Sequence, residues 1–402
     1  MFAPYRLLFK TPGGLRFSLS GFIGRMPISM DSLAIIFIVV HATHSYTLAG
    51  VLAAVAAIVV TFALPFWSRT ADRMGQGRTL LIAVPLRTIF IIAFILLVAL
   101  GAPTWSWFLS IIAAEASFIN TGGLVRRRWF WALGKGGEDR NLINTALSFE
   151  ALMDEIVFIF GPVLATACAT SIYPSAGLIA GLIFLLLGSL AFGLQKDTEP
   201  PAHPRDHDDP HPPVMRNTSV QAVVLPAIFI GGFFSSVGIV VVGFMQSHGA
   251  TSRTGLMLAV WSLGSATSAI LHGSIQWRMN HAKRFWIFLS ALTILSIPFL
   301  FVHSQTTLAI ALFFNGLAIS PLLVATYGLA ESAVPPAQIT ETLAWVIAGM
   351  PLGGAATSAI AGWVIDNYGA QRGFILPFAS LSCAMAMSLP YFRTWNRLRS
   401  AS

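Results

Sequence analysis

Residues 196–217 read KDTEPPAHPRDHDDPHPPVMRN and separate two long apolar regions of the chain. The stretch contains six prolines among charges of both signs. Proline lacks the backbone N–H that a helix interior needs, so this composition favours an extended linker over a membrane span. The sequence therefore predicts two domains, residues 1–195 and residues 218–402, which are joined by a cytoplasmic linker over residues 196–217.

Three histidines of this linker, His203, His207 and His211, lie among acidic residues. A metal site needs ligands that the surrounding structure holds in place. Nothing rigid is expected in a proline-rich segment, so we interpret the three histidines as part of a solvated linker. The sequence predicts no metal site and no cofactor.

The apolar regions on both sides of the linker indicate a membrane protein. Of the 402 residues, 55% are hydrophobic and 10% are charged, whereas soluble domains carry roughly 25% charged residues. A spanning helix needs about 20 apolar residues. The runs are too long for β-barrel strands and do not alternate with period two. They predict twelve helices, over residues 15–40, 45–68, 79–100, 104–124, 141–167, 173–195, 219–246, 253–275, 284–302, 306–330, 341–365 and 370–392.

Basic residues are distributed unequally between the two sides of the predicted membrane. With the N-terminus placed in the cytoplasm, the outer loops hold only Arg253 and Arg372, while Arg25 and Arg87 fall within spans. This asymmetry predicts a multi-pass protein of the cell (plasma) membrane with both termini cytoplasmic. The predicted cytoplasmic segments hold the other 20 of the 24 basic residues: Arg6, Lys10, Arg16, Arg69, Arg73, Arg78, Arg126, Arg127, Arg128, Lys135, Arg140, Lys196, Arg205, Arg216, Arg278, Lys283, Arg284, Arg393, Arg397 and Arg399.

The formal net charge of +8 follows from this topology. Contact with anionic lipids is sufficient to explain it, so no nucleic-acid partner is expected.

A weak internal repeat relates the two halves. Residues 68–78 read SRTADRMGQGR, and residues 273–283 read GSIQWRMNHAK. Both segments follow the second predicted span of their half, and both carry Arg-Met followed by a basic residue at the end. Parallel repeats of this kind are a known transporter architecture.

Residues 68–78 resemble the loop signature between the second and third spans of the major facilitator superfamily. The matching residues are Asp72, Arg73, Gly75 and a basic Arg78, together with Ala71. The resemblance implies two pseudo-symmetric six-helix bundles, an all-α membrane fold. It also implies that the signature loop acts in conformational switching, by holding the halves together in the outward-open state.

Gly161 and Pro162, in the fifth predicted span, resemble the centre of the antiporter motif of this superfamily. The motif's other glycines are replaced here by Val157, Ala165 and Thr166. This partial resemblance points towards bacterial drug/proton antiporters, and hence towards efflux.

Charged residues within spans are costly and need partners or a function. All those in mid-span belong to the first half, and at 1.5 Å per residue most lie roughly 14–20 Å from their span ends. Glu150 and Asp154 are four residues apart and share a helix face, so one must be protonated or a cation must neutralise the pair. Arg25 and Arg87 are expected to be the only buried cations. The candidate substrate- and proton-binding residues are Arg25, Asp31, Arg87, Glu115, Glu150, Asp154 and Glu155.

The same charges could instead form a static network that joins the first, third and fifth spans. Within the set, Arg87 is the best structural candidate, because third spans of this fold resemble scaffold helices. Glu115 and Asp31 are the best working candidates, because first and fourth spans of the family line the cavity. Glu115 is expected to be the only charge in the fourth span.

The second half has no charge in the middle of a predicted span. Its candidate functional residues are instead those that bend helices, allow close packing or line an apolar cavity. Candidate hinge or packing residues are Pro27, Gly161, Pro162, Gly349 and Gly353, because proline and glycine permit bending and close helix approach. The aromatic residues that could line an apolar cavity are Phe229, Phe233, Phe234, Phe244, Trp261, Phe313, Phe314, Tyr327 and Trp345.

These features favour a monomeric secondary transporter whose partners are a small-molecule substrate, protons and the lipid bilayer. Proton-coupled efflux of amphipathic compounds is the leading hypothesis, since buried acids opposite aromatic residues suit a cationic substrate. Proton-coupled uptake of a small metabolite, with Arg25 binding an anion, is the alternative. A non-transporting receptor or scaffold is a third class. No nucleophile–base pair, metal cluster or phosphate loop is visible in the sequence, so an enzyme is not expected.

Overall fold

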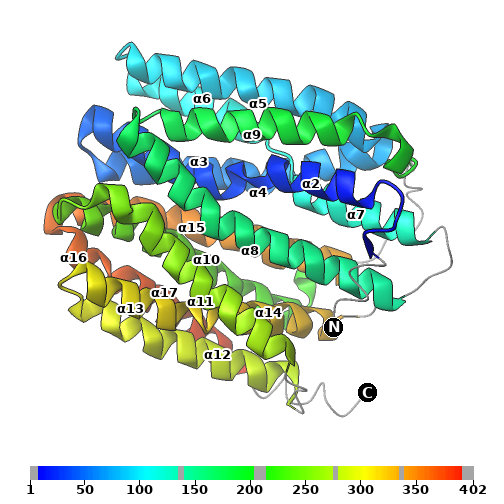
Figure 1. The fold of residues 1–402 in the computed structure, drawn as a ribbon. Coiled ribbons are helices and arrows are strands. Elements are labelled where there is room, and N and C mark those ends of the chain that lie inside the picture. The colour runs from blue at the N-terminus through cyan, green and yellow to red at the C-terminus, as the bar shows by residue number, and fades with distance from the viewer. Residues whose placement is uncertain (1–7, 135–139, 203–213, 275–278, 335–338, 392–402) are drawn as a thin grey trace. The chain divides into compact units, whose positions relative to one another are not determined.

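The computed structural model describes residues 8–134, 140–202, 214–274, 279–334 and 339–391, and every regular element in these ranges is helical (Figure 1). Twelve helical stretches in the described ranges are long and apolar enough to cross a membrane. This confirms the all-α fold with twelve spans. The linker histidines His203, His207 and His211 lie outside the described residues.

The chain divides into two compact units. The first comprises Met1–Ile38 and Phe62–His207, and the second comprises Val39–Thr61 and Asp208–Ser402. Helices α3 and α4 therefore have residues in both units. The elements up to the linker are α2 (Gly14–Arg25), α3 (Pro27–Thr43), α4 (Tyr46–Met74), α5 (Gln76–Ala99), α6 (Thr104–Ala116), α7 (Thr121–Gly134), α8 (Arg140–Ser171), α9 (Ala176–Gly193) and the short 3-10 helix η1 (Lys196–Thr198).

Within the first unit, α5 packs against α6 and α9, and α2 packs against α7, α8 and α9 (Figure 1). Two spans of this unit are interrupted. The first breaks between α2 and α3 at Met26, directly before Pro27, whose missing N–H suits the start of a helix. The fourth breaks between α6 and α7, and α7 carries that span on to Leu133, beyond the predicted end at residue 124.

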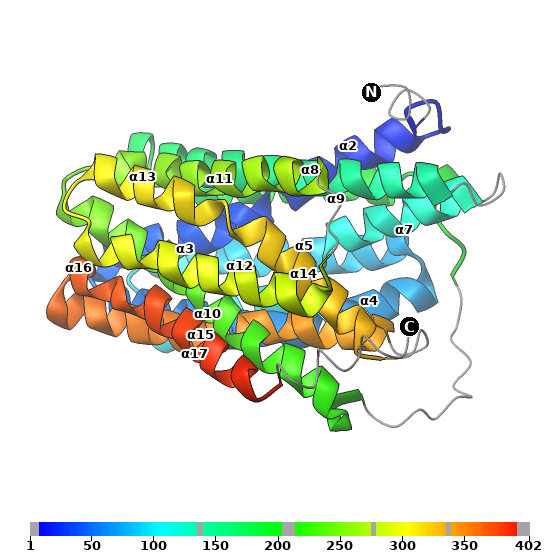
Figure 2. The ribbon, with the colours of Figure 1, turned by 90° about the horizontal axis from the view of Figure 1, so that it is seen from below.

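The second unit begins, after the linker, with the 3-10 helix η2 and ends with η6, and in it α11 packs against α13 (Figure 2). Its elements are η2 (Val214–Arg216), α10 (Thr218–Ser247), η3 (Thr251–Arg253), α11 (Thr254–Ser274), α12 (His281–Ser296), η4 (Ile297–Phe301), α13 (Gln305–Gly316), α14 (Ile319–Ser332), α15 (Ile339–Tyr368), α16 (Ala370–Gly373), α17 (Ile375–Ser388) and η6 (Leu389–Tyr391).

The most extensive helix contact among the described residues of this unit joins α10 and α15. A Cβ atom on Gly353 of α15 would collide with the backbone carbonyl of Ile228 on α10. Small residues allow helix backbones to approach this closely in membranes, where van der Waals packing replaces the hydrophobic effect between helices.

Candidate functional site

Arg25 lies at the centre of the first buried charge cluster. Its guanidinium is 1% exposed and reaches from α2 to two carboxylates of α8. One Nη donates to Glu150, and the other donates to Asp154 Oδ1 at 2.7 Å. The spacing of four residues places both acids on one face of α8, so that one cation serves both.

Glu150 accepts hydrogen bonds from two further side chains in addition to the one from Arg25. Ser18 Oγ donates to its Oε1 at 2.5 Å, and the indole Nε1 of Trp129 donates to the same oxygen at 2.7 Å. The Glu150 side chain has no solvent exposure. A buried carboxyl group with this set of donors acts as a structural anchor for α2, α7 and α8.

Asp154 forms the more accessible end of this cluster. Its second oxygen accepts from Arg126 Nη2 of α7 at 2.5 Å, and both side chains are about one-third exposed. Two arginines therefore face two carboxylates, and the Glu150–Asp154 pair is neutralised by cations.

This geometry corrects the sequence-based expectations about the cations. Arg126 was expected in a cytoplasmic loop, but α7 extends the fourth span and carries it into the cluster. Arg126 and its neighbours show that Glu115 is not the only charge in the fourth span, and the buried Arg128 shows that Arg25 and Arg87 are not the only buried cations. Arg128, also on α7, is fully buried, stacks 3.7 Å from the ring of Phe192 and donates to Gln76.

Arg87 of α5 lies at the centre of the second cluster. It binds Glu115 of α6 bidentately, at 2.9 and 3.0 Å, and donates to Asp31 Oδ2 of α3 at 2.7 Å. All three side chains are buried or nearly so. One cation here faces two carboxylates, so the cluster has one acid in excess.

Glu155 stands apart from both clusters. It follows Asp154 on α8, is partly buried, and forms no ion pair within the described part of the chain. A carboxyl group in a membrane span without a basic partner is costly as an ion.

The charges therefore form two clusters, and not one network across the first, third and fifth spans. The first joins α2, α7 and α8, which belong to the first, fourth and fifth spans. The second joins α3, α5 and α6, which belong to the first, third and fourth spans. Sequence reasoning missed Ser18, Trp129 and Arg126 as partners. The three consecutive arginines at positions 126–128 could have indicated these partners if the fourth span had been predicted to continue through them.

The signature loop between α4 and α5 has a defined geometry. Asp72 pairs with Arg127 of α7. Gly75 adopts φ 90° and ψ 153°, a conformation that favours glycine, and it caps α5. Glu199, just after η1, accepts the Gly77 N–H at 2.8 Å, so the linker begins at the N-terminus of α5. Arg73 and Arg78 are exposed.

The predicted hinge and packing residues lie as follows. Pro27 begins α3, and Pro162 lies inside the continuous helix α8. Gly161 faces Ser29 of α3, where a side chain on residue 161 would clash. Gly349 lies against Ile228 of α10.

In the second unit, the aromatic side chains of Phe233, Phe234 and Trp261 form a group with ring centroids 5.3–5.8 Å apart. The Trp261 indole donates to Asn315 Oδ1 at 2.9 Å. Both Phe234 and Trp261 remain partly exposed.

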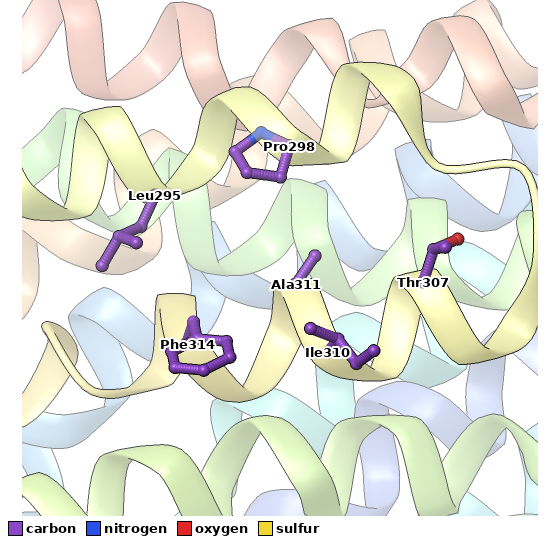
Figure 3. Close-up of a pocket in the computed structure, with 6 residues that line it drawn as sticks. All are labelled: Leu295, Pro298, Thr307, Ile310, Ala311 and Phe314. Atoms are coloured by element: carbon purple, nitrogen blue, oxygen red, sulfur yellow. The ribbon is translucent and has the colours of Figure 1, made fainter.

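A pocket of about 270 Å³ also lies in the second unit, between the α12–η4 segment and α13 (Figure 3). It is lined by Leu295, Pro298, Thr307, Ile310, Ala311 and Phe314. These side chains are almost entirely apolar and carry no charge, so this pocket lacks the chemistry of the two charge clusters.

Comparison with known proteins supports the fold. The sequence model of the Major Facilitator Superfamily matches residues 223–400. No curated protein sequence matches the chain. Among solved structures, the nucleoside transporter NupG has a TM-score of 0.72 and 12% identity over 95% of this chain and 98% of its own.

Two further structures are similar at comparable coverage. The POT family transporter PepTSo has a TM-score of 0.73 and 9% identity, over 98% of this chain and 99% of its own. A bacterial homologue of the iron transporter ferroportin, in an inward-facing state, has a TM-score of 0.67 and 13% identity, over 95% of this chain and 98% of its own. At these identities the similarity concerns the fold.

Proposed function

Taking this chain as a transporter of the major facilitator superfamily, we propose that it exports small amphipathic compounds in exchange for protons. The observation that carries the proposal is the charge imbalance around Arg87, where one buried guanidinium faces the carboxylates of Asp31 and Glu115. Two carboxylates sharing one cation in a low-dielectric region favour the uptake of a proton by one of them.

Within this cluster, Asp31 is the proposed exchanging group. Glu115 holds Arg87 through two parallel hydrogen bonds, whereas Asp31 has one bond and a side chain exposed to 13%. A bidentate pair is the stronger of the two arrangements. Asp31 is therefore the acid that we assign to proton exchange with water or with a cationic substrate, and Arg87 keeps its structural role.

Proton movement and substrate export are coupled because both ligands use the same carboxylate. A cationic compound and a proton both neutralise the Asp31 carboxylate, so each weakens the binding of the other. In alternating access, the proton taken up on the outside displaces the compound there and is released to the cytoplasm when the next molecule binds.

Uptake of a small metabolite is the second candidate, and the accessible Arg126–Asp154 pair is the observation that favours it. An anionic group on a substrate would compete with Asp154 for Arg126. Of the structurally similar proteins, NupG is described as a nucleoside transporter and PepTSo as a POT family transporter. A nucleoside is therefore a suitable probe for this alternative.

The test uses purified protein in sealed vesicles with an imposed pH gradient, with ethidium as the cationic probe and uridine as the metabolite probe. We expect gradient-driven ethidium flux in the wild type, and at least a tenfold loss in Asp31→Asn. The matched control is Asp197→Asn, because Asp197 is an exposed acid that forms no ion pair among the described residues. Gradient-driven uridine accumulation without ethidium flux would replace efflux by uptake. An Asp31→Asn protein with full gradient response would contradict the role of Asp31.

A further inference from the structure

The chain contains a second copy of the turn that forms the signature loop. Residues 72–78 read DRMGQGR, and residues 366–372 read DNYGAQR, so both have the pattern Asp-x-x-Gly-x-x-Arg. The first connects the second and third spans, and the second connects the eleventh and twelfth. Nine spans separate the two turns along the chain, so they lie on opposite sides of the membrane.

The two turns also share their backbone geometry. Gly75 has φ 90° and ψ 153°, and Gly369 has φ 86° and ψ 157°. Each glycine caps the helix that follows it, and each donates its N–H to the carbonyl four residues earlier, that of Ala71 at 3.1 Å and that of Ile365 at 3.0 Å. A similar sequence pattern therefore builds the same turn twice.

The aspartates of the two turns have different partners. Asp72 pairs with Arg127 in the first unit. Asp366 instead accepts three hydrogen bonds at the start of α4, from the N–H groups of Tyr46 at 2.8 Å and Thr47 at 2.7 Å and from Ser45 Oγ at 3.0 Å. All four residues belong to the second unit. Asp366 thus acts as the N-cap of a helix that lies 320 positions earlier in the chain.

Neighbouring contacts hold the first two turns of α4 in the same place. Tyr46 Oη donates to the side chain of Gln246 on α10. Gly362 of α15 lies against the backbone carbonyl of Tyr46, and Gly50 of α4 lies against the backbone carbonyl of Ser358, so that neither position accepts a side chain.

Two features suit this contact to reversible opening. The Asp366 side chain is exposed, so water can replace its partners at low cost. In addition, Ser45 Oγ accepts the N–H of Leu48 at 3.1 Å, so α4 keeps a cap of its own when Asp366 withdraws.

We propose that the Asp366 turn is a conformational lock on the side of the membrane opposite the signature loop. In this structure the Asp366 carboxylate holds the start of α4 against α15. In the alternate state of the transport cycle the bond to α4 opens, and the contact of Gly50 with the Ser358 region opens with it. This role depends on neither the substrate nor the coupling ion proposed above.

The test is the accessibility of residue 358. Cys168 and Cys383 are replaced by alanine, Ser358→Cys is introduced, and a membrane-impermeant maleimide is applied to intact cells and, separately, to inside-out vesicles. Ser358 is 6% exposed, so the parent should label slowly from the side that carries the Asp366 turn. Asp366→Asn should raise the labelling rate from that side by about tenfold, the ratio that corresponds to the loss of one helix cap.

Two further variants make the outcome decisive. Ser45→Ala removes one donor to Asp366 together with the hydrogen bond from the Leu48 N–H, and it leaves the Tyr46 and Thr47 donors in place. It should give a smaller rise in the labelling rate, and it tests the lock if Asp366→Asn does not accumulate in the membrane. Asn367→Ala is the matched control, because the Asn367 side chain is exposed and donates only to Trp363 of its own helix. Equal labelling rates in Asp366→Asn, Ser45→Ala and Asn367→Ala would overturn the lock. Because no substrate or proton gradient is used, a failure here is independent of a failure of proton-coupled efflux.

Discussion

The guanidinium of Arg25 on α2 lies 2.7 Å from the carboxylate of Asp154 on α8, across 129 positions of sequence. This ion pair joins the first span to the fifth inside the first unit. Asp154 in turn binds Arg126, so a chain of alternating charges runs from the fully buried Glu150 to a pair that is about one-third exposed. The buried Glu150 end of the cluster therefore anchors the helices, while the Arg126–Asp154 end is accessible.

Arg25 should be essential for stability. Arg25→Met leaves Glu150 and Asp154 in a buried site with one cation fewer, and an uncompensated buried charge costs about 3–5 kcal/mol. Arg126→Met removes a more exposed cation and should cost much less. Thermal unfolding of the two purified variants in detergent checks this, and equal loss of melting temperature would contradict the anchoring role of Arg25.

Glu155 and Asp154 should differ although they are adjacent. Glu155 has no ion-pair partner in the described residues, so Glu155→Gln should leave stability nearly unchanged and reduce the response of flux to an imposed pH gradient. Asp154→Asn breaks pairs with two arginines and should lower the melting temperature. Ethidium flux in vesicles and thermal unfolding are measured on both proteins. A Glu155→Gln protein with a full gradient response would show that this acid takes no part in coupling.

Asp72 should matter for transport more than for folding. Asp72→Ala removes the partner of Arg127 at the signature loop, where both side chains are partly exposed, so the loss of stability should be small. We expect flux to fall at least tenfold while the protein remains inserted and monodisperse. Arg69→Ala is the control, because Arg69 is an exposed basic residue nearby that is not one of the matching signature residues. Wild-type turnover in purified Asp72→Ala would refute the switching role.

The predicted topology is open to direct measurement. Ala102 lies in the turn between α5 and α6, which is expected outside, and Ser400 belongs to the C-terminal segment, which is expected inside. In a background without native cysteines, an impermeant reagent should label Ala102→Cys but not Ser400→Cys in intact cells. The reverse pattern would show that the topology is inverted.

The sequence by itself determined the number of spans and the membrane environment. Each span is a local property, because about 20 consecutive apolar residues are enough to cross the hydrocarbon region. The spacing of Glu150 and Asp154 on one helix face was equally local. Even the two Asp-x-x-Gly-x-x-Arg turns are visible in the printed sequence, since their backbone depends on a glycine at one position.

The tertiary structure alone decided which charges meet. Hydropathy ended the fourth span before Arg126, because three consecutive arginines are costly in lipid, yet α7 continues through them and buries Arg128 against Phe192 and Gln76. Likewise, two turns of the same pattern and backbone bind different partners, Arg127 for Asp72 and the start of α4 for Asp366. Asp72 and Arg127 are more than 50 positions apart in the sequence, and Asp366 and the start of α4 are more than 300 positions apart. Helix packing brings each pair together, and only this proximity gives the charged side chain its ion pair or its helix N-terminus.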